Sequence, residues 1–210
     1  YDAVRRSSVW NASNVEPRYV VGVDIGSSGI RAVVAEAVGT RIKIIGSARE
    51  PVYGAVRKGE IIEIQRTASS IRNAVQRAAD QASVRVYDVY VTANGEYMRG
   101  LNTRAGVGIG NEEREVAGVD MTRALKLAGN IDLPAERVKL HVLKQKVAVD
   151  ALTELDNPAG LTGIRLECEA HLITAPKNAI LNLKKTVREA DYRCSGISIS
   201  IFAAAQAALS

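Results

Sequence analysis

Three strand-like segments follow one another near the start of the chain, and this succession restricts the possible folds more than any other feature. Residues 19–26 form an apolar run that ends in glycine, and residues 30–38 and 42–48 follow after short turns. Two apolar runs joined by a Gly/Ser turn predict a β-hairpin, and the third run extends the hairpin into a meander. This opening differs from the strand–helix–strand start of a dinucleotide-binding fold.

The segments that follow predict a mixed α/β unit. Residues 67–82 carry apolar side chains at helical spacing, and residues 87–93 read as a strand. The apolar face of this helix consists of Ile71, Ala74, Val75, Ala78 and Ala82. Much later in the chain, Pro176 fits the first turn of a second helix. A strand over residues 194–200 and an alanine-rich helix that runs to Leu209 complete the unit.

Residues 94–174 have a different texture, and we expect them to form an inserted unit of strands with one helix. The insert contains a glycine-rich extended stretch, a helix, a strand with a bulge, a turn cluster and a strand of period two. In chain order these are residues 102–110, 118–129, 138–149, 156–160 and 164–172. The predicted organisation is therefore a flexible arm over residues 1–17, an outer unit over residues 18–93 and 175–210, and the insert.

The composition supports a folded core of aliphatic side chains. Hydrophobic residues make up 47% of the 210 residues, while Phe and Trp occur once each. A chain of this length removes roughly 70% of its surface from water, so a sizeable core of Val, Ile, Leu and Ala is possible. Disordered, collagen-like and low-complexity classes are excluded on the same grounds.

The net charge restricts the classes of partner that we expect, and the cysteine content indicates the cellular compartment. The net charge of +5 suits nucleic acid or acidic lipid, but the basic residues are dispersed and not interleaved with aromatics, so we expect no nucleic-acid partner. The cysteines and histidines lack the spacing of a disulfide framework or a zinc site, and we expect each to pack in or beside a sheet. These are Cys168, Cys194, His141 and His171. No apolar run approaches the ~18 residues of a membrane-spanning helix and no signal peptide is visible, which predicts a cytosolic protein.

The strongest chemical feature is the turn that joins the first two predicted strands. A tight Gly/Ser turn directs successive backbone N–H groups at one point, which suits phosphate oxygens. Gly26, Ser27 and Ser28 are the candidate phosphate-binding residues. Asp24, at the end of the first strand, is a candidate to hold Mg²⁺ through water, because this ion keeps much of its hydration shell. The alternative is a plain hairpin turn in which glycine and serine serve the backbone geometry alone.

Other candidate residues carry less chemistry. Glu112, Glu113 and Glu115 form a cluster that precedes a predicted helix, where negative charge suits the helix dipole. Trp10 lies in the predicted arm and is either disordered or an anchor for a partner. No Ser/His/Asp set has a supporting motif, so no catalytic residue is assigned.

Residues 20–33, Val-Val-Gly-Val-Asp-Ile-Gly-Ser-Ser-Gly-Ile-Arg-Ala-Val, resemble the first phosphate-binding hairpin of the actin-like ATPases. Later stretches resemble FtsA, the bacterial actin-like cell-division family, across residues 18–209. These stretches are residues 57–62, 89–91, 114–115, 140–142, 156–163 and 169–174. The fold implied is α/β, an actin-like (ribonuclease H-like) ATPase subdomain with an inserted small α+β subdomain.

The resemblance also implies a function. FtsA-like proteins bind ATP and Mg²⁺, polymerise head-to-tail, tether FtsZ to the membrane through a C-terminal helix, and receive later division proteins on the insert. The expected location is the cytoplasmic face of the inner membrane at the division site. At most a weak ATPase activity is expected of the complete, two-lobed protein. The sequence given does not contain the family's second lobe or C-terminal helix, so we expect this chain alone to bind ATP weakly and to hydrolyse it negligibly.

The chain departs from the family pattern at several positions. Relatives usually carry lysine in the hairpin where this chain has Gly29, and Arg31 or Lys58 is a possible replacement for that positive charge. A proline is replaced by Lys144, and the glycine that would end the late helix is replaced by Asp191. Loss of the lysine contact with phosphate would cost roughly 1.5–3 kcal/mol of binding free energy.

Two alternative functions remain open from the sequence. One is a pilus-assembly actin homologue that binds a membrane-protein tail, which shares the hairpin and the insert but not the stretch Asn157-Pro-Ala-Gly-Leu-Thr-Gly163. The other is a small-molecule kinase of the same superfamily, which requires a catalytic aspartate and a sugar pocket. Nothing in the sequence supplies that pocket.

Overall fold

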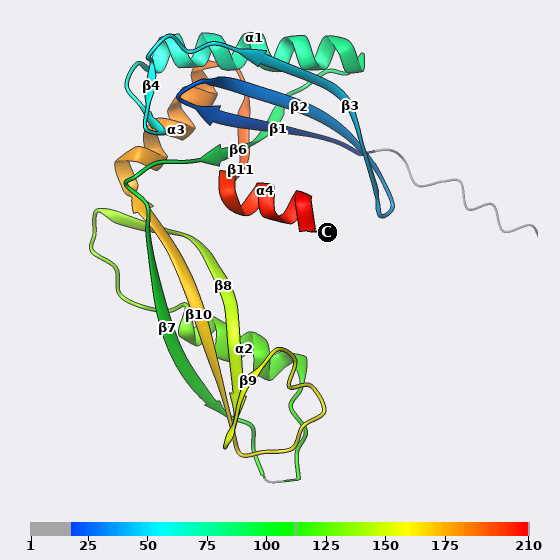
Figure 1. Cartoon of the computed structure of the whole chain (residues 1–210), viewed down its shortest axis with the longest axis vertical. Coiled ribbons are helices and arrows are strands. Elements are labelled where there is room, and N and C mark those ends of the chain that lie inside the picture. The colour runs from blue at the N-terminus through cyan, green and yellow to red at the C-terminus, as the bar shows by residue number, and fades with distance from the viewer. Residues whose placement is uncertain (1–17, 112, 210) are drawn as a thin grey trace, which may run out of the picture.

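The computed structural model of the protein describes residues 18–111 and 113–209. The predicted arm over residues 1–17, including Trp10, lies outside the described residues. The described chain forms two main β-sheets, each with its own helices, that follow one another along the longest axis of the molecule (Figure 1).

The first sheet has the strand order β11-β6-β1-β2-β3. Its strands are β1 (Arg18–Gly26), β2 (Gly29–Val38), β3 (Arg41–Glu50), β6 (Asp88–Ala93) and β11 (Arg193–Ile199). Strands β1, β2 and β3 form the antiparallel meander that the sequence predicts. Strands β6 and β11 continue the sheet in parallel with β1, so β2 is the one strand of this sheet that runs against the other four.

Helix α1 (Ile64–Ala82) covers one face of the first sheet (Figure 1). It begins earlier than the predicted residue 67 and ends where predicted, with Ser83 in the left-handed conformation at φ 55°. The helix approaches β3 so closely at Gly46 that a Cβ atom there would lie 2.1 Å from the carbonyl oxygen of Ala78. Alternate residues of β1 and β2 meet the helix and form the core, for example Val23, Ile25, Ile30 and Val34.

The second sheet has the strand order β7-β10-β8-β9 and is antiparallel throughout. Its strands are β7 (Arg99–Gly108), β8 (Arg137–Val149), β9 (Leu152–Leu155) and β10 (Arg165–Pro176). Helix α2 (Gly118–Ala128) packs across β7 and β10 over a separate core that includes Leu166 and Cys168. The bulge predicted for residues 138–149 is confirmed, because the register between β8 and β10 shifts between Cys168 and Ala170.

A buried carboxylate, Asp120, fixes the start of α2. Its Oδ2 accepts a hydrogen bond from the Ala117 N–H at 3.1 Å, and its carboxylate pairs with the Arg114 guanidinium at 3.0 Å. The hydrogen bond from Ala117, with smaller contributions from the nearby arginines, lowers the pKa of Asp120. The acidic residue in the first turn is therefore Asp120 and none of the glutamates that the sequence singled out. Glu115 instead pairs through its main chain with Thr162 in an isolated antiparallel β-bridge, and Glu112 lies outside the described residues.

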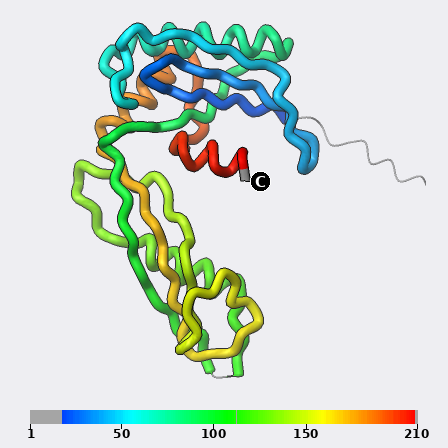
Figure 2. The backbone as a smooth tube through the Cα atoms, in the orientation of Figure 1, coloured from blue at the N-terminus to red at the C-terminus, as the bar shows by residue number. Residues whose placement is uncertain are grey.

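The chain crosses between the two sheets twice, and the two crossings run side by side (Figure 2). Arg137, at the start of β8, donates hydrogen bonds to the carbonyl oxygens of Tyr97 at 3.3 Å and Thr174 at 2.9 Å. Val138 and Leu140 pack against the core of the first sheet. The junction is thus held by hydrogen bonds from the Arg137 side chain to main-chain carbonyl groups and by apolar packing.

Two further helices and a small hairpin complete the first unit. Helix α3 (Lys177–Glu189) packs beside α1, and its start corrects the prediction for Pro176, which is the last residue of β10 and pairs with Arg137. Helix α4 (Ser200–Leu209) follows β11 directly, and β4 (Val56–Arg57) and β5 (Glu60–Ile61) form the hairpin. None of the helices described is both long enough and apolar enough to span a membrane.

Candidate functional site

The turn between β1 and β2 has a backbone conformation that depends on Gly29. Gly26 pairs with Gly29, and Ser27 and Ser28 form the two-residue connection. Gly29 has a φ of 146°, a region that side-chain-bearing residues rarely adopt, and a Cβ atom there would lie 2.7 Å from the carbonyl oxygen of Glu50. The lysine that the resemblance leads us to expect at this position is therefore incompatible with this hairpin conformation.

The turn offers hydrogen-bond donors at its tip. Within the described part of the chain, neither the Ser27 nor the Ser28 N–H has an acceptor. The Ser27 hydroxyl oxygen accepts a hydrogen bond from the Gly59 N–H at 3.2 Å, and the Ser28 carbonyl oxygen accepts one from Arg49 at 3.0 Å. These contacts fasten the turn and leave its N–H groups available to an anion.

Asp24 lies where the carboxyl ends of the parallel strands meet. The register pairs Asp24 of β1 with Thr92 of β6, and Thr92 with Ser198 of β11. The Asp24 Oδ1 atom accepts hydrogen bonds from the Thr92 hydroxyl at 2.6 Å and the Ser200 hydroxyl at 2.8 Å. Its side chain is 35% exposed, so the carboxylate remains accessible at this edge of the sheet.

Arg31 lies beside Asp24, whereas Lys58 does not. The Arg31 Nη1 atom is 3.1 Å from Asp24 Oδ2, and the two residues face each other across the β1–β2 ladder. Lys58 instead pairs with Glu96 at 3.0 Å, and both of those side chains are largely exposed. Of the two possible replacements for the missing lysine, the structure brings Arg31 to the site.

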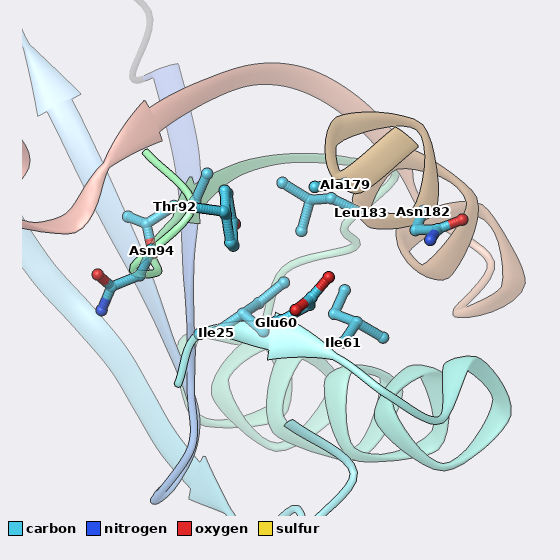
Figure 3. A pocket seen from close by; sticks show the side chains of 11 residues that line it. Ile25, Glu60, Ile61, Thr92, Asn94, Ala179, Asn182 and Leu183 are labelled. Atoms are coloured by element: carbon cyan, nitrogen blue, oxygen red, sulfur yellow. The ribbon is translucent and has the colours of Figure 1, made fainter. Parts of the chain in front are cut away.

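A small cavity lies next to the hairpin, between β1, β5, β6 and α3 (Figure 3). Ile25, Thr92 and Leu183 line it, together with Glu60 and the polar side chain of Asn182. Its volume is about 20 Å³, which is room for one water molecule and not for a nucleotide. This cavity therefore cannot accommodate the base of a nucleotide.

The donor set at Asp24 fits a hydrated magnesium ion. No group of three or more His, Cys, Asp or Glu side chains that could hold a metal occurs within residues 18–111 and 113–209. Mg²⁺ in nucleotide sites is commonly held by one or two carboxylates, waters and the phosphates themselves. One accessible carboxylate beside a turn with free N–H groups meets that requirement.

A groove lies between α3, the outer edge of β11 and the start of β8, with a volume of about 440 Å³. Apolar side chains line it, and three lysines stand among them. The apolar residues include Val138, Leu140, Ile180, Leu181 and Ile197, and the lysines are Lys139, Lys177 and Lys184. Leu181 is 55% exposed, although it is a large apolar side chain. The sequence analysis missed this groove because the start of β8 is distant in sequence from α3 and β11, which form the rest of its walls.

Thr92 and Ser200 were also missed by the sequence analysis. Each is a hydroxyl-bearing residue at or just beyond the carboxyl end of a strand that runs parallel to β1. That position is the signal that could have found them, because the carboxyl ends of parallel strands converge at one edge of a sheet.

The strand order and directions, with Asp24 and a Gly/Ser turn at the end of the first strand, define an actin-like (ribonuclease H-like) ATPase subdomain that carries a small α+β insert. The fold class predicted from the sequence is confirmed. Residues 95–174 match the family model described as the SHS2 domain inserted in FtsA, and the chain belongs to the FtsA family of cell-division proteins.

Similarity to known proteins supports both the fold class and the family. The chain is 32% identical to cell division protein FtsA of Pseudomonas aeruginosa over 94% of this chain and 47% of the relative. It is 33% identical to that of Borreliella burgdorferi over 91% of this chain and 46% of the relative. The chain thus spans about half the length of these relatives. A solved structure of the PilM-PilN type IV pilus biogenesis complex is similar with a TM-score of 0.58 and 16% identity, covering 89% of this chain and 49% of that chain, a likeness in fold alone.

Proposed function

We propose that the chain supplies the phosphate-binding side of a Mg·ATP site in an FtsA-type cell-division protein. Gly26, Ser27 and Ser28 form the phosphate-binding turn, in which the N–H groups of Ser27 and Ser28 bind phosphate oxygens, and Asp24 holds Mg²⁺ through water. The observation that carries the proposal is that an accessible carboxylate and free turn N–H groups share one edge of the sheet. The bound ion would supply charge neutralisation between the carboxylate and the phosphates.

Arg31 takes over the role of the lysine that relatives carry at the position of Gly29. Its guanidinium neutralises Asp24 in the structure as described. Once a divalent cation neutralises Asp24 instead, the guanidinium is free to pair with a phosphate. A charge-assisted hydrogen bond of this kind contributes roughly 1.5–3 kcal/mol. Arg31 would therefore keep most of the binding free energy that the missing lysine would provide.

Membership of the FtsA family supports a proposal for the role of the whole protein. We propose that it polymerises, tethers FtsZ to the cytoplasmic face of the membrane at the division site, and recruits later division proteins. Any ATPase activity belongs to the complete protein, because this chain contributes contacts to the phosphates only. We also propose that the outer unit comprises residues 18–93 and 175–210 and that residues 94–174 form the partner-binding insert.

We place the partner contact at the junction of the insert with the outer unit, in the groove between α3, β11 and the start of β8. Its apolar lining and its three lysines suit an extended segment that carries acidic side chains. Strand β11 lies at the edge of its sheet, so the segment can also bond to its free main-chain groups. Lys184→Glu should reduce co-purification of later division proteins, whereas Lys43→Glu, at an exposed position of the edge strand β3 outside this groove, should not. Equal recovery with both variants would remove this assignment.

Nucleotide titration tests the site directly. Displacement of a fluorescent ATP analogue, in the presence of Mg²⁺, gives the affinity of the chain and of its variants. Asp24→Asn should weaken ATP binding by roughly 10-fold or more, which corresponds to about 1.4 kcal/mol. Asp156→Asn is the matched control, because Asp156 is an exposed aspartate of the insert that pairs with Lys146. Equal affinity of the two variants would remove Asp24 from the site.

Co-sedimentation separates the division role from the alternative pilus role. The complete protein should sediment with FtsZ polymers and should leave a pilus-protein tail peptide in the supernatant. The opposite result, with FtsZ unbound and the tail peptide bound, would favour a binding module like the one in the pilus complex.

A further inference from the structure

Helix α4 starts at the candidate site and is held by few neighbours. It leaves the carboxyl end of β11 without a loop and lies on the side of the first sheet opposite α1 (Figure 1). Its surface is largely exposed, and Ile201 in the first turn is 78% exposed. The contacts made by the first turn therefore decide where this helix lies.

The first contact joins α4 to Asp24. The Ser200 hydroxyl donates to Asp24 Oδ1 at 2.8 Å, and the Thr92 hydroxyl donates to the same oxygen at 2.6 Å. Arg31 occupies one position on Oδ2. A carboxylate oxygen has two lone pairs, so Oδ1 has none left for a further donor.

The second contact joins α4 to the second sheet. The Phe202 ring packs against the His141 ring of β8, with their centroids 5.5 Å apart and their planes at 41°. The His141 Nε2 atom is buried and has no hydrogen-bond partner among the described residues. Burial lowers the pKa of His141, which favours the neutral ring at the contact with Phe202.

We propose that the first turn of α4 couples the candidate Mg·ATP site to the insert, because Ser200 holds Asp24 and Phe202 holds β8 of the insert through His141. This coupling rests on the function proposed above. A hydrated Mg²⁺ at Asp24 brings waters that donate hydrogen bonds to the carboxylate. Waters of the ion that face Oδ2 take the place of Arg31, and waters that face the saturated Oδ1 compete with Ser200, which is held on a largely exposed helix. Release of Ser200 shifts the turn that also carries Phe202.

The coupling is reciprocal. Ser200 and Phe202 lie two residues apart in one helical turn, so a displacement of either moves the other. A partner that reorients β8 therefore changes the affinity of the Asp24 site by the same factor by which the nucleotide changes the affinity for that partner. The first turn of α4 would thus link occupancy of the nucleotide site to partner binding on the insert.

The two histidines of the chain provide the readout. NMR of the imidazole groups reports on His141 at the contact with α4. His171 on β10, whose ring nitrogen Nδ1 lies 2.6 Å from Asn102 Oδ1, serves as an internal reference. Phe202→Leu defines the shift of the His141 signals when its partner ring is lost. Ser200→Ala, without nucleotide, should move these signals in the same direction and bring the titration midpoint of His141 closer to its ordinary value of 6.5. Thr92→Val removes the other donor to the same oxygen from β6 and should leave His141 unchanged.

Mg·ATP added to the unmodified chain should shift His141 as Ser200→Ala does and should leave His171 in place. Unchanged His141 signals in Ser200→Ala would overturn the coupling, whether or not ATP binds. If the His141 signals shift in Ser200→Ala but do not shift when ATP is shown to bind, the nucleotide does not act through this coupling. The proposed function would still stand. Failure of ATP to bind at all would remove the proposed function and the nucleotide end of the coupling with it.

Discussion

Replacement of Gly29 by alanine tests the geometry of the candidate phosphate-binding turn. Alanine at φ 146° enters a region that is almost restricted to glycine, at a cost of about 1–3 kcal/mol. The new Cβ atom would lie 2.7 Å from the Glu50 carbonyl oxygen, a main-chain atom that has no rotamer to change. Crowding of this kind typically costs another ~1–3 kcal/mol. We expect Gly29→Ala to lower the free energy of unfolding by about 2–6 kcal/mol.

Gly39→Ala is the matched control, because Gly39 also has a positive φ, 59°, but a Cβ atom there would meet nothing within 4 Å. Its cost should be about 1 kcal/mol, from the backbone alone. Urea unfolding followed by circular dichroism gives both values on the same chain. If Gly29→Ala destabilises the protein no more than Gly39→Ala does, the hairpin adapts to a side chain and the reasoning about Gly29 is wrong.

Gly29→Lys extends the test to function. Restoring the lysine of the relatives should carry the same loss of stability as alanine and should not tighten ATP binding, because the side chain cannot occupy this position without moving β3. A stable Gly29→Lys variant with tighter ATP binding would show instead that this chain retains the hairpin geometry of its relatives.

Three further outcomes are expected. Gly46→Ala should destabilise the protein by about 3 kcal/mol or more in urea unfolding, because its Cβ atom would lie 2.1 Å from a main-chain oxygen of α1; a loss below about 1 kcal/mol would show that the helix can shift. Asp120→Ala should cost about 1–2 kcal/mol in the same assay through loss of the α2 cap, and an unchanged midpoint would contradict this. Because burial lowers the folded-state pKa of His141, the free energy of unfolding should fall as pH decreases below 6.5, since the unfolded chain then binds more protons. His141→Phe should reduce that pH dependence between about pH 7.5 and pH 5.5, and an identical slope would refute the assignment.

Local pattern predicted the elements of this fold because their periodicities are strong. The meander, α1 and the alternating strand β10 all have apolar residues at a period that matches one buried face. The start of α1 was placed late because Ile64 and its neighbours precede the clear helical repeat. Pro176 was placed in a helix because its fixed φ suits a first turn, whereas pairing with Arg137 keeps it in β10.

The candidate site was predictable only in part, because half of it is local and half is not. Asp24 and the Ser27–Ser28 turn lie within one hairpin and could be found by motif. Thr92 and Ser200 reach Asp24 from 68 and 176 residues away in sequence. Their placement depends on the parallel pairing of β1, β6 and β11, which no local pattern specifies.

The position of the positive charge near the hairpin follows from strand geometry. Residues 29 and 31 are two apart on β2, so their side chains would leave the same face of the sheet. A charge moved from position 29 to position 31 therefore stays on the same face and is displaced by about 7 Å along the strand. A long arginine side chain spans much of that distance, and cross-strand pairing already directs Arg31 to Asp24. Glycine at position 29 thus relocates the positive charge of the site to a residue that can exchange between Asp24 and a phosphate.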